Sequence, residues 1–75
     1  MHIVERVNGI SDCQCDGKWH LMYKDGADVL SFAGLHTGRM TGKDCTIEVF
    51  DTESEMNGRI AALGLTNPAD EDRAL

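Results

Sequence analysis

The chain has 75 residues, which leaves room for one small core and no second domain. Seven basic and thirteen acidic residues give a net charge of −6 and a pI near 4.7, and this sign disfavours direct binding to nucleic-acid phosphates. The sequence contains no apolar stretch of about 20 residues and no signal-peptide core at its start. We therefore expect a protein of the cytoplasm of the producing cell, with no membrane partner.

The first residues predict strands separated by short turns. β-Branched side chains favour a strand over residues 2–7, and Asn8-Gly9 is a typical hairpin turn. Residues 11–17 are mostly polar and contain two aspartates and a glycine. They therefore predict a loop.

The clearest strand signal is the alternation of apolar and polar residues over residues 18–24. Asp25-Gly26 predicts a tight turn, and residues 28–33 predict the return strand, so a hairpin of about residues 18–33 follows. The side chains expected to face the core from this hairpin are Trp19, Leu21, Tyr23, Leu30 and Phe32.

Residues 34–44 predict a long loop or a poorly formed hairpin, because they contain three glycines and few apolar side chains. Residues 46–50 alternate again and predict a fourth strand. In this strand Ile47 and Val49 share one face. Phe50 points the other way, where it is placed to pack under the next element.

One helix is predicted over about residues 53–63. Thr52 and Glu55 form a capping box at its start, and Gly64 suits a left-handed end. The apolar residues of its buried face are Met56, Ile60 and Leu63. Asn57-Gly58 inside this segment is also a hairpin signal, and that alternative stays open.

These elements together predict an α+β fold, in which a small antiparallel sheet of about four strands, built as hairpins, is packed by one C-terminal helix. We expect a single domain over residues 1–65, followed by an acidic C-terminal tail over residues 66–75. The tail contains Pro68 and the run Asp70-Glu71-Asp72, which is too charged to bury itself.

Cysteine and histidine are the ligand types that zinc prefers, and the chain has five candidates for such a site. They are Cys13, Cys15, Cys45, His20 and His36. Their spacing lacks the paired C-x₂-C of a zinc knuckle, so the ligands would have to converge from separate places. We therefore predict no cofactor, and a small zinc-binding module stands as an alternative hypothesis.

No catalytic motif is present in the sequence. A nucleophilic cysteine needs a histidine base within hydrogen-bond reach, and no spacing in the chain indicates such a pair. The glycine-rich residues 34–44 also fail the phosphate-loop pattern, because Asp44 follows Lys43 and a strand follows instead of a helix. We predict that the protein is not an enzyme.

The segment from Ile47 to Leu65 combines a strand, a capped helix and the ending Leu63-Gly64-Leu65. In these features it resembles many short bacteriophage-encoded α+β proteins. The resemblance implies a phage origin and assigns no functional residues.

We therefore predict a non-enzymatic protein–protein interaction module, as a minor structural component of a bacteriophage particle, associated with its capsid or tail. Its partner would be a larger protein or, in a homo-oligomer, a second copy, and incorporation would place the chain in the virion. The residues expected to contact the partner are Leu35, Arg39, Met40, Lys43 and Leu75. The alternative is a small acidic phage inhibitor of a host defence or regulatory protein, because an acidic surface can imitate nucleic acid.

Overall fold

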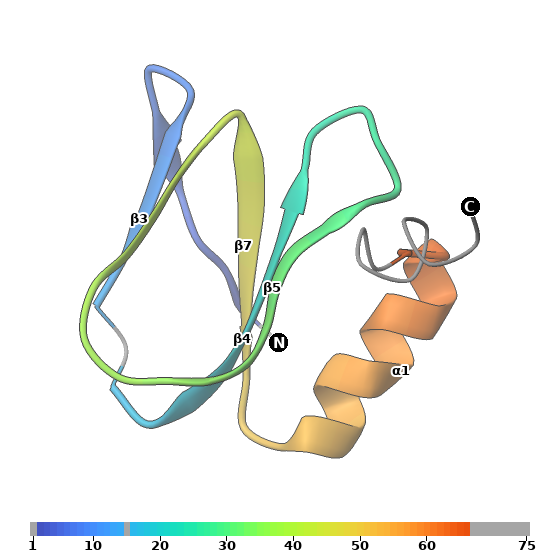
Figure 1. Cartoon of the computed structure of the whole chain (residues 1–75). Coiled ribbons are helices and arrows are strands. Elements are labelled where there is room, and N and C mark those ends of the chain that lie inside the picture. Colours follow the sequence, from blue (N-terminus) through green and yellow to red (C-terminus); the bar gives the residue numbers. More distant parts are fainter. Residues whose placement is uncertain (1, 15, 67–75) are drawn as a thin grey trace.

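Two antiparallel sheets and one helix form the part of the chain that the structure, a computed structural model, describes: residues 2–14 and 16–66 (Figure 1). The elements are β1 (His2–Ile3), β2 (Arg6–Val7), β3 (Ile10–Cys13), β4 (Lys18–Lys24), β5 (Leu30–His36), β6 (Met40–Lys43), β7 (Cys45–Phe50) and α1 (Glu53–Leu63). The predicted small antiparallel α+β fold with one C-terminal helix is confirmed. The expected single sheet of about four strands is wrong, because β2, β3 and β6 form a second sheet.

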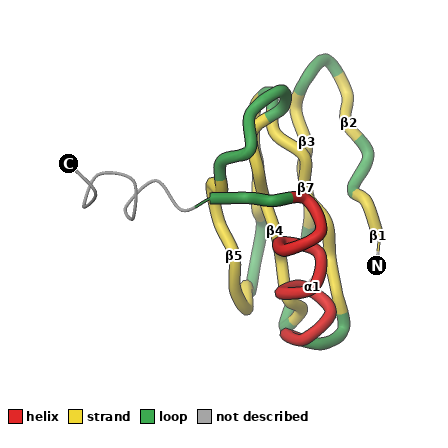
Figure 2. Tube along the Cα trace, turned by 90° about the vertical axis from the view of Figure 1, so that its right-hand side faces the viewer, coloured by secondary structure: helices red, strands yellow, loops and turns green. Residues whose placement is uncertain are grey.

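The elements lie in three layers. The four-stranded sheet, in the order β1-β7-β4-β5, is the middle layer. The helix α1 covers one of its faces and the sheet β2-β3-β6 covers the other (Figures 1 and 2). Strands β4 and β7, in the centre of the middle sheet, therefore have neighbours on both faces.

The N-terminal segment joins the two sheets. Its predicted single strand is instead two short strands: β1 pairs with β7 and β2 pairs with β3. The chain bends between them at Val4, which is buried and donates its backbone N–H to the carbonyl of Ile47 at 2.9 Å. On the opposite side, no ladder joins β5 to β6 among the described strands, so the two sheets form a barrel that is open there.

The predicted loop over residues 11–17 is wrong in its first half, which forms β3. Ser11 and Cys13 point inward and are buried, whereas Ile10 and Asp12 point outward. The alternation is regular, but the inward side chains are a hydroxyl and a thiol. A search for alternating hydrophobic residues could therefore not reveal the strand β3.

The prediction of a long loop or a poorly formed hairpin over residues 34–44 is also wrong, because these residues contribute to two strands that belong to different sheets. The first of these residues extend β5 and the last form β6, so only residues 37–39 connect the two strands. In β6, Met40 and Gly42 face the core. A Cβ atom on Gly42 would lie 2.5 Å from the Sδ atom of Met22, so glycine lets β6 approach the middle sheet closely.

Leu30 and Phe32 were expected to share a face, and the structure places them on opposite faces of the middle sheet. The β4–β5 ladder shifts register here: Met22 pairs with Phe32, but Tyr23 pairs with Leu30. The extra residue, Ser31, forms a β-bulge. The bulge interrupts the alternation of side chains between the two faces, so a spacing of two residues no longer places Leu30 and Phe32 on the same face. No turn signal in the sequence marks the bulge.

The middle sheet separates two hydrophobic cores. The core under α1 contains Leu21, Phe50 and Met56, with Trp19, Tyr23, Leu30, Ile60 and Leu65 packed around them. The core between the sheets contains Val4, Cys13, Met40, Ile47 and Val49, with Met22 and Phe32 packed around them. The side chains of β4 and β7 alternate between the two faces as predicted. Their apolar residues, however, pack into two separate cores on opposite sides of the middle sheet.

The helix begins and ends where the sequence predicts. The Thr52 hydroxyl accepts a hydrogen bond from the Glu55 N–H at 3.2 Å, and Gly64 has φ 66° in the left-handed region. Leu65 then donates its N–H to the carbonyl of Ile60. Asn57-Gly58 is helical, so the hairpin alternative for this dipeptide is wrong.

The two glycines Gly42 and Gly58 give a matched test of this packing. Gly42→Ala should lower the free energy of unfolding by about 1–3 kcal/mol, because the new methyl group collides with Met22 in a filled core. Gly58→Ala adds the same methyl group on an open helical surface and should raise that free energy by up to about 1 kcal/mol. Urea unfolding of both variants measures the two values, and a neutral Gly42→Ala would contradict the close approach of β6.

Candidate functional site

The residues predicted to contact a partner do not form one surface. Leu35 lies on the edge strand β5 and is 56% exposed, whereas Arg39 directly precedes β6 and Lys43 is its last residue. Met40 was expected as an exposed anchor, and this prediction is wrong, because its side chain is buried between the sheets at 6% exposure. Leu75 lies outside the described residues.

One face of the sheet β2-β3-β6 points away from the middle sheet, and we call it the outer face. The registers place on it Val7, Ile10, Asp12, Thr41 and Lys43. No described element packs over this face, so its side chains reach solvent (Figures 1 and 2).

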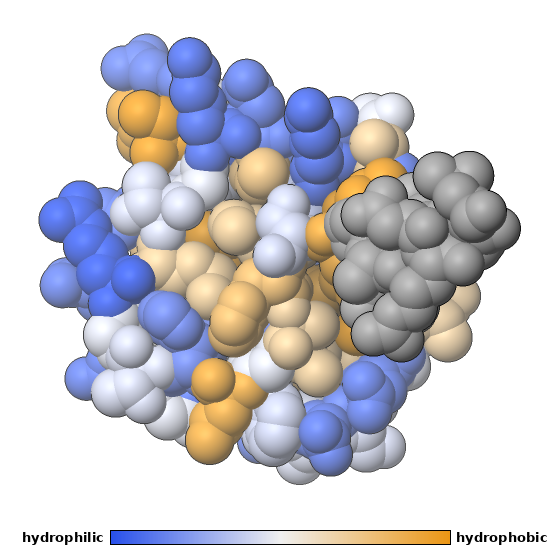
Figure 3. Space-filling view, viewed as in Figure 1, coloured by the Kyte–Doolittle hydropathy of each residue, from blue (hydrophilic) through white to orange (hydrophobic). Residues whose placement is uncertain are grey.

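An apolar pair occupies the hairpin end of the outer face. Val7 and Ile10 lie directly opposite one another across the β2–β3 ladder, 70% and 42% exposed. Asn8 and Gly9 form the turn between them with positive φ angles, which fixes this register. Lys43 pairs with Ile10 from the other side. Figure 3 shows an apolar spot at this hairpin, surrounded by hydrophilic residues.

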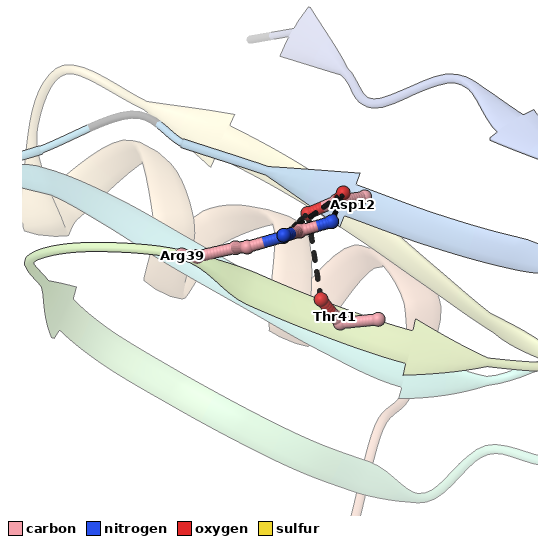
Figure 4. A network of polar contacts seen from close by, with 3 residues as sticks. All are labelled: Asp12, Arg39 and Thr41. Carbon is pink, nitrogen blue, oxygen red and sulfur yellow. Dashed lines mark hydrogen bonds and ion pairs between the residues drawn. The ribbon is translucent and has the colours of Figure 1, made fainter.

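An ion pair occupies the other end of the outer face (Figure 4). The Arg39 guanidinium donates from Nε to Asp12 Oδ1 at 2.8 Å and from Nη2 to Asp12 Oδ2 at 2.5 Å, and the Thr41 hydroxyl also donates to Asp12 at 3.4 Å. The hydrogen bonds from Arg39 hold the pKa of Asp12 below its usual value. The bidentate fork orients the Arg39 guanidinium toward Asp12.

A thiol and an imidazole meet between the sheets. His20 is fully buried, and its Nδ1 lies 2.8 Å from the carbonyl oxygen of Lys18, which can only accept. Nδ1 therefore donates, and in the neutral ring Nε2 is left to face the Cys13 sulfur at 3.5 Å. The His36 ring packs edge-on against His20, with centroids 5.2 Å apart. No spacing in the sequence indicates this pair, because Cys13 and His20 belong to different sheets.

The five predicted zinc ligands are only partly brought together. Cys13, His20 and His36 lie near one another, but Cys45 lies at the start of β7, where its sulfur is 3.9 Å from the Ser31 hydroxyl. Cys15 lies outside the described residues. Within residues 2–14 and 16–66, no three His, Cys, Asp or Glu side chains are arranged to hold a metal ion.

A buried carboxylate links the helix to the sheet. Glu48 on β7 is fully buried, and its Oε1 accepts from the Arg59 Nε at 2.9 Å. Its Oε2 accepts from the Tyr23 hydroxyl and from Arg59 Nη2. The sequence placed Glu48 on the face of Phe50, toward the helix, but it could not show that Arg59 would meet it.

This arrangement positions the helix and offers little chemistry. Both Glu48 oxygens are occupied by donors, and neither is left to face solvent. Removing one partner from such a buried pair is strongly destabilising. We interpret the cluster as a structural attachment of α1.

Comparison with known proteins returns no relative. No family model, no curated protein and no solved structure matches this chain. The bacteriophage origin therefore stays a prediction. Among the described residues, α1 is the one helix, and it is too short and too polar to cross a membrane.

Tyr23 is the single tyrosine of the chain, so its ionisation can be followed directly by the ultraviolet absorbance of tyrosinate. Burial, and then the hydrogen bond to Glu48, raise the pKa of its hydroxyl above the ordinary value. Because the folded state holds this proton more tightly, the group stabilises the fold fully below about pH 10. That contribution is lost as the pH rises through the raised pKa.

An alkaline titration of the folded protein should therefore give a pKa above that of the urea-unfolded chain. Glu48→Gln should lower the folded value, because the carboxylate no longer repels tyrosinate, while burial keeps it above the unfolded value. Equal pKa values in the folded and unfolded chains would contradict the buried contact.

Proposed function

We propose that this chain is a non-enzymatic protein–protein interaction module, which binds a larger protein of an assembly through the outer face. The exposed pair Val7 and Ile10 carries the proposal, since two large apolar side chains lie side by side where no described element covers them. Single exposed apolar residues are ordinary, whereas contiguous exposed apolar side chains are a feature of contact surfaces. The assembly that we propose is a bacteriophage particle, on the resemblance of residues 47–65.

The chemistry of the outer face indicates the matching surface. Val7 and Ile10 provide apolar area, and the adjacent Lys43 forms no ion pair with the described residues. The Arg39–Asp12 pair adds a bidentate ion pair at the other end of the same face. A complementary partner would present an apolar patch with a carboxylate at the position of Lys43.

The buried polar clusters support a binding role more than a catalytic one. The Glu48 oxygens are taken by Tyr23 and Arg59, and the His20 nitrogens face the Lys18 carbonyl and the Cys13 sulfur. His20, Glu48 and Cys13 are each at most 4% exposed, so a substrate could not reach them without opening the fold.

Quantitative mass spectrometry of particles purified from the producing cells tests this function. The chain should be present at a fixed copy number per particle. The double variant Val7→Thr/Ile10→Thr keeps β-branched side chains but removes apolar contact area, and it should reduce incorporation about tenfold. Ile3→Thr is the matched control, because Ile3 is 50% exposed but lies on the middle sheet, opposite Glu48.

Three results would contradict the proposal: absence of the chain from particles, a double variant that is incorporated normally, or equal losses for the double variant and Ile3→Thr. Absence from particles together with tight binding to one host protein would favour the inhibitor hypothesis instead. Circular dichroism of each variant shows whether the fold is retained.

A further inference from the structure

The chain contains three asparagines, and two of them precede a glycine. Asn8-Gly9 forms the turn between β2 and β3, whereas Asn57-Gly58 lies within α1. The third asparagine precedes Pro68, which has no N–H. The two Asn-Gly dipeptides therefore present the same chemical groups in two different backbone settings.

An asparagine that precedes a glycine can lose its side-chain amide to the neighbouring backbone. The glycine nitrogen bonds to the side-chain carbonyl carbon, and the amide nitrogen leaves as ammonia with the proton from the glycine N–H. Water then adds to the resulting cyclic imide, which opens to aspartate or to isoaspartate. Glycine favours the ring because it has no Cβ atom and few backbone restrictions. The reaction requires a glycine N–H that no hydrogen bond holds.

The turn between β2 and β3 leaves the reacting groups accessible. Asn8 is exposed, and the Gly9 N–H has no hydrogen-bond acceptor within residues 2–14 and 16–66. The Gly9 carbonyl accepts from the Asp44 N–H at 2.8 Å, but this bond does not involve the nitrogen that reacts. The turn ends a strand of two residues at the edge of its sheet, away from α1 (Figure 1). Such a short edge hairpin opens locally at low free-energy cost.

The helix holds the same groups of Asn57-Gly58 in place. Both residues are exposed, so access to solvent does not distinguish them from the turn. In α1, however, the Gly58 N–H donates to the carbonyl of Ser54, one turn earlier. The glycine nitrogen can therefore react only after this part of the helix opens.

We propose that Asn8 is a site of spontaneous deamidation, with water as the co-reactant, and that Asn57 retains its amide while the chain is folded. The modification needs no partner and does not depend on the proposed function. Its products lie on the outer face, where each adds a negative charge beside Val7 and Ile10.

The two products differ in their effect on the hairpin. Aspartate retains the turn, because aspartate adopts a positive φ angle at low cost, as Asp44 does here with φ 56°. Isoaspartate carries the main chain through its Cβ atom, so the turn becomes longer by one atom. A two-residue turn of this type fixes the register, and the longer turn disrupts the pairing of Val7 with Ile10.

Incubation of the intact chain in mildly alkaline buffer, followed by peptide mapping, tests the proposal. Mass spectrometry follows the change from amide to acid in the separate peptides that contain Asn8 and Asn57. Conversion of Asn8 should be faster by about tenfold or more, because the reaction of Asn57 first requires opening of the helix. The chain unfolded in guanidinium chloride is the control, and there the two rates should be similar.

Equal rates in the folded chain, or a faster conversion of Asn57, would overturn the proposal. It would also be overturned if folding protected Asn8 as strongly as it protects Asn57. The isoaspartate form, separated by chromatography, should exchange its amide hydrogens across the β2–β3 ladder faster than the variant Asn8→Asp does. Equal exchange in these two forms would contradict the disrupted pairing.

Discussion

Strand β4 must be buried on both faces, and the rest of the fold follows from this requirement. Its alternation places Trp19, Leu21 and Tyr23 on one face and His20 and Met22 on the other. An amphipathic helix can cover the first face, but the second needs its own layer. The chain builds that layer from three short strands, and the bend at Val4 connects it to the middle sheet.

The polar residues inside these layers have partners in every described case. Ser11 donates to the Cys45 carbonyl, His20 is held between Lys18 and Cys13, and Glu48 accepts from Tyr23 and Arg59. A slip of one residue in β4 or β7 would turn His20 or Glu48 into the opposite core, where it would be buried without these partners. The polar interior therefore stabilises the correct strand registers against the alternatives.

The segments that were predicted correctly are those whose caps or alternation pattern lie entirely within the segment itself. The helix follows from Thr52 and Gly64, and β4 follows from its strict alternation. Strands β3 and β6 are missed because Ser11 and Gly42 occupy inward positions where a hydrophobic pattern expects large apolar residues. Only part of the outer face could be predicted from the sequence.

Lys43 stands out as an exposed cation in the sequence, whereas the pairing of Val7 with Ile10 needs the register of a strand that the sequence does not reveal. The same two-sided burial of β4 explains why no ladder joins β5 to β6 among the described strands. The 11 residues of α1 cover Leu21 and Phe50, and residues 53–63 are then not available as a further strand between β5 and β6. A chain of 75 residues can cover both faces of its central strand or close the barrel, and here the faces are covered.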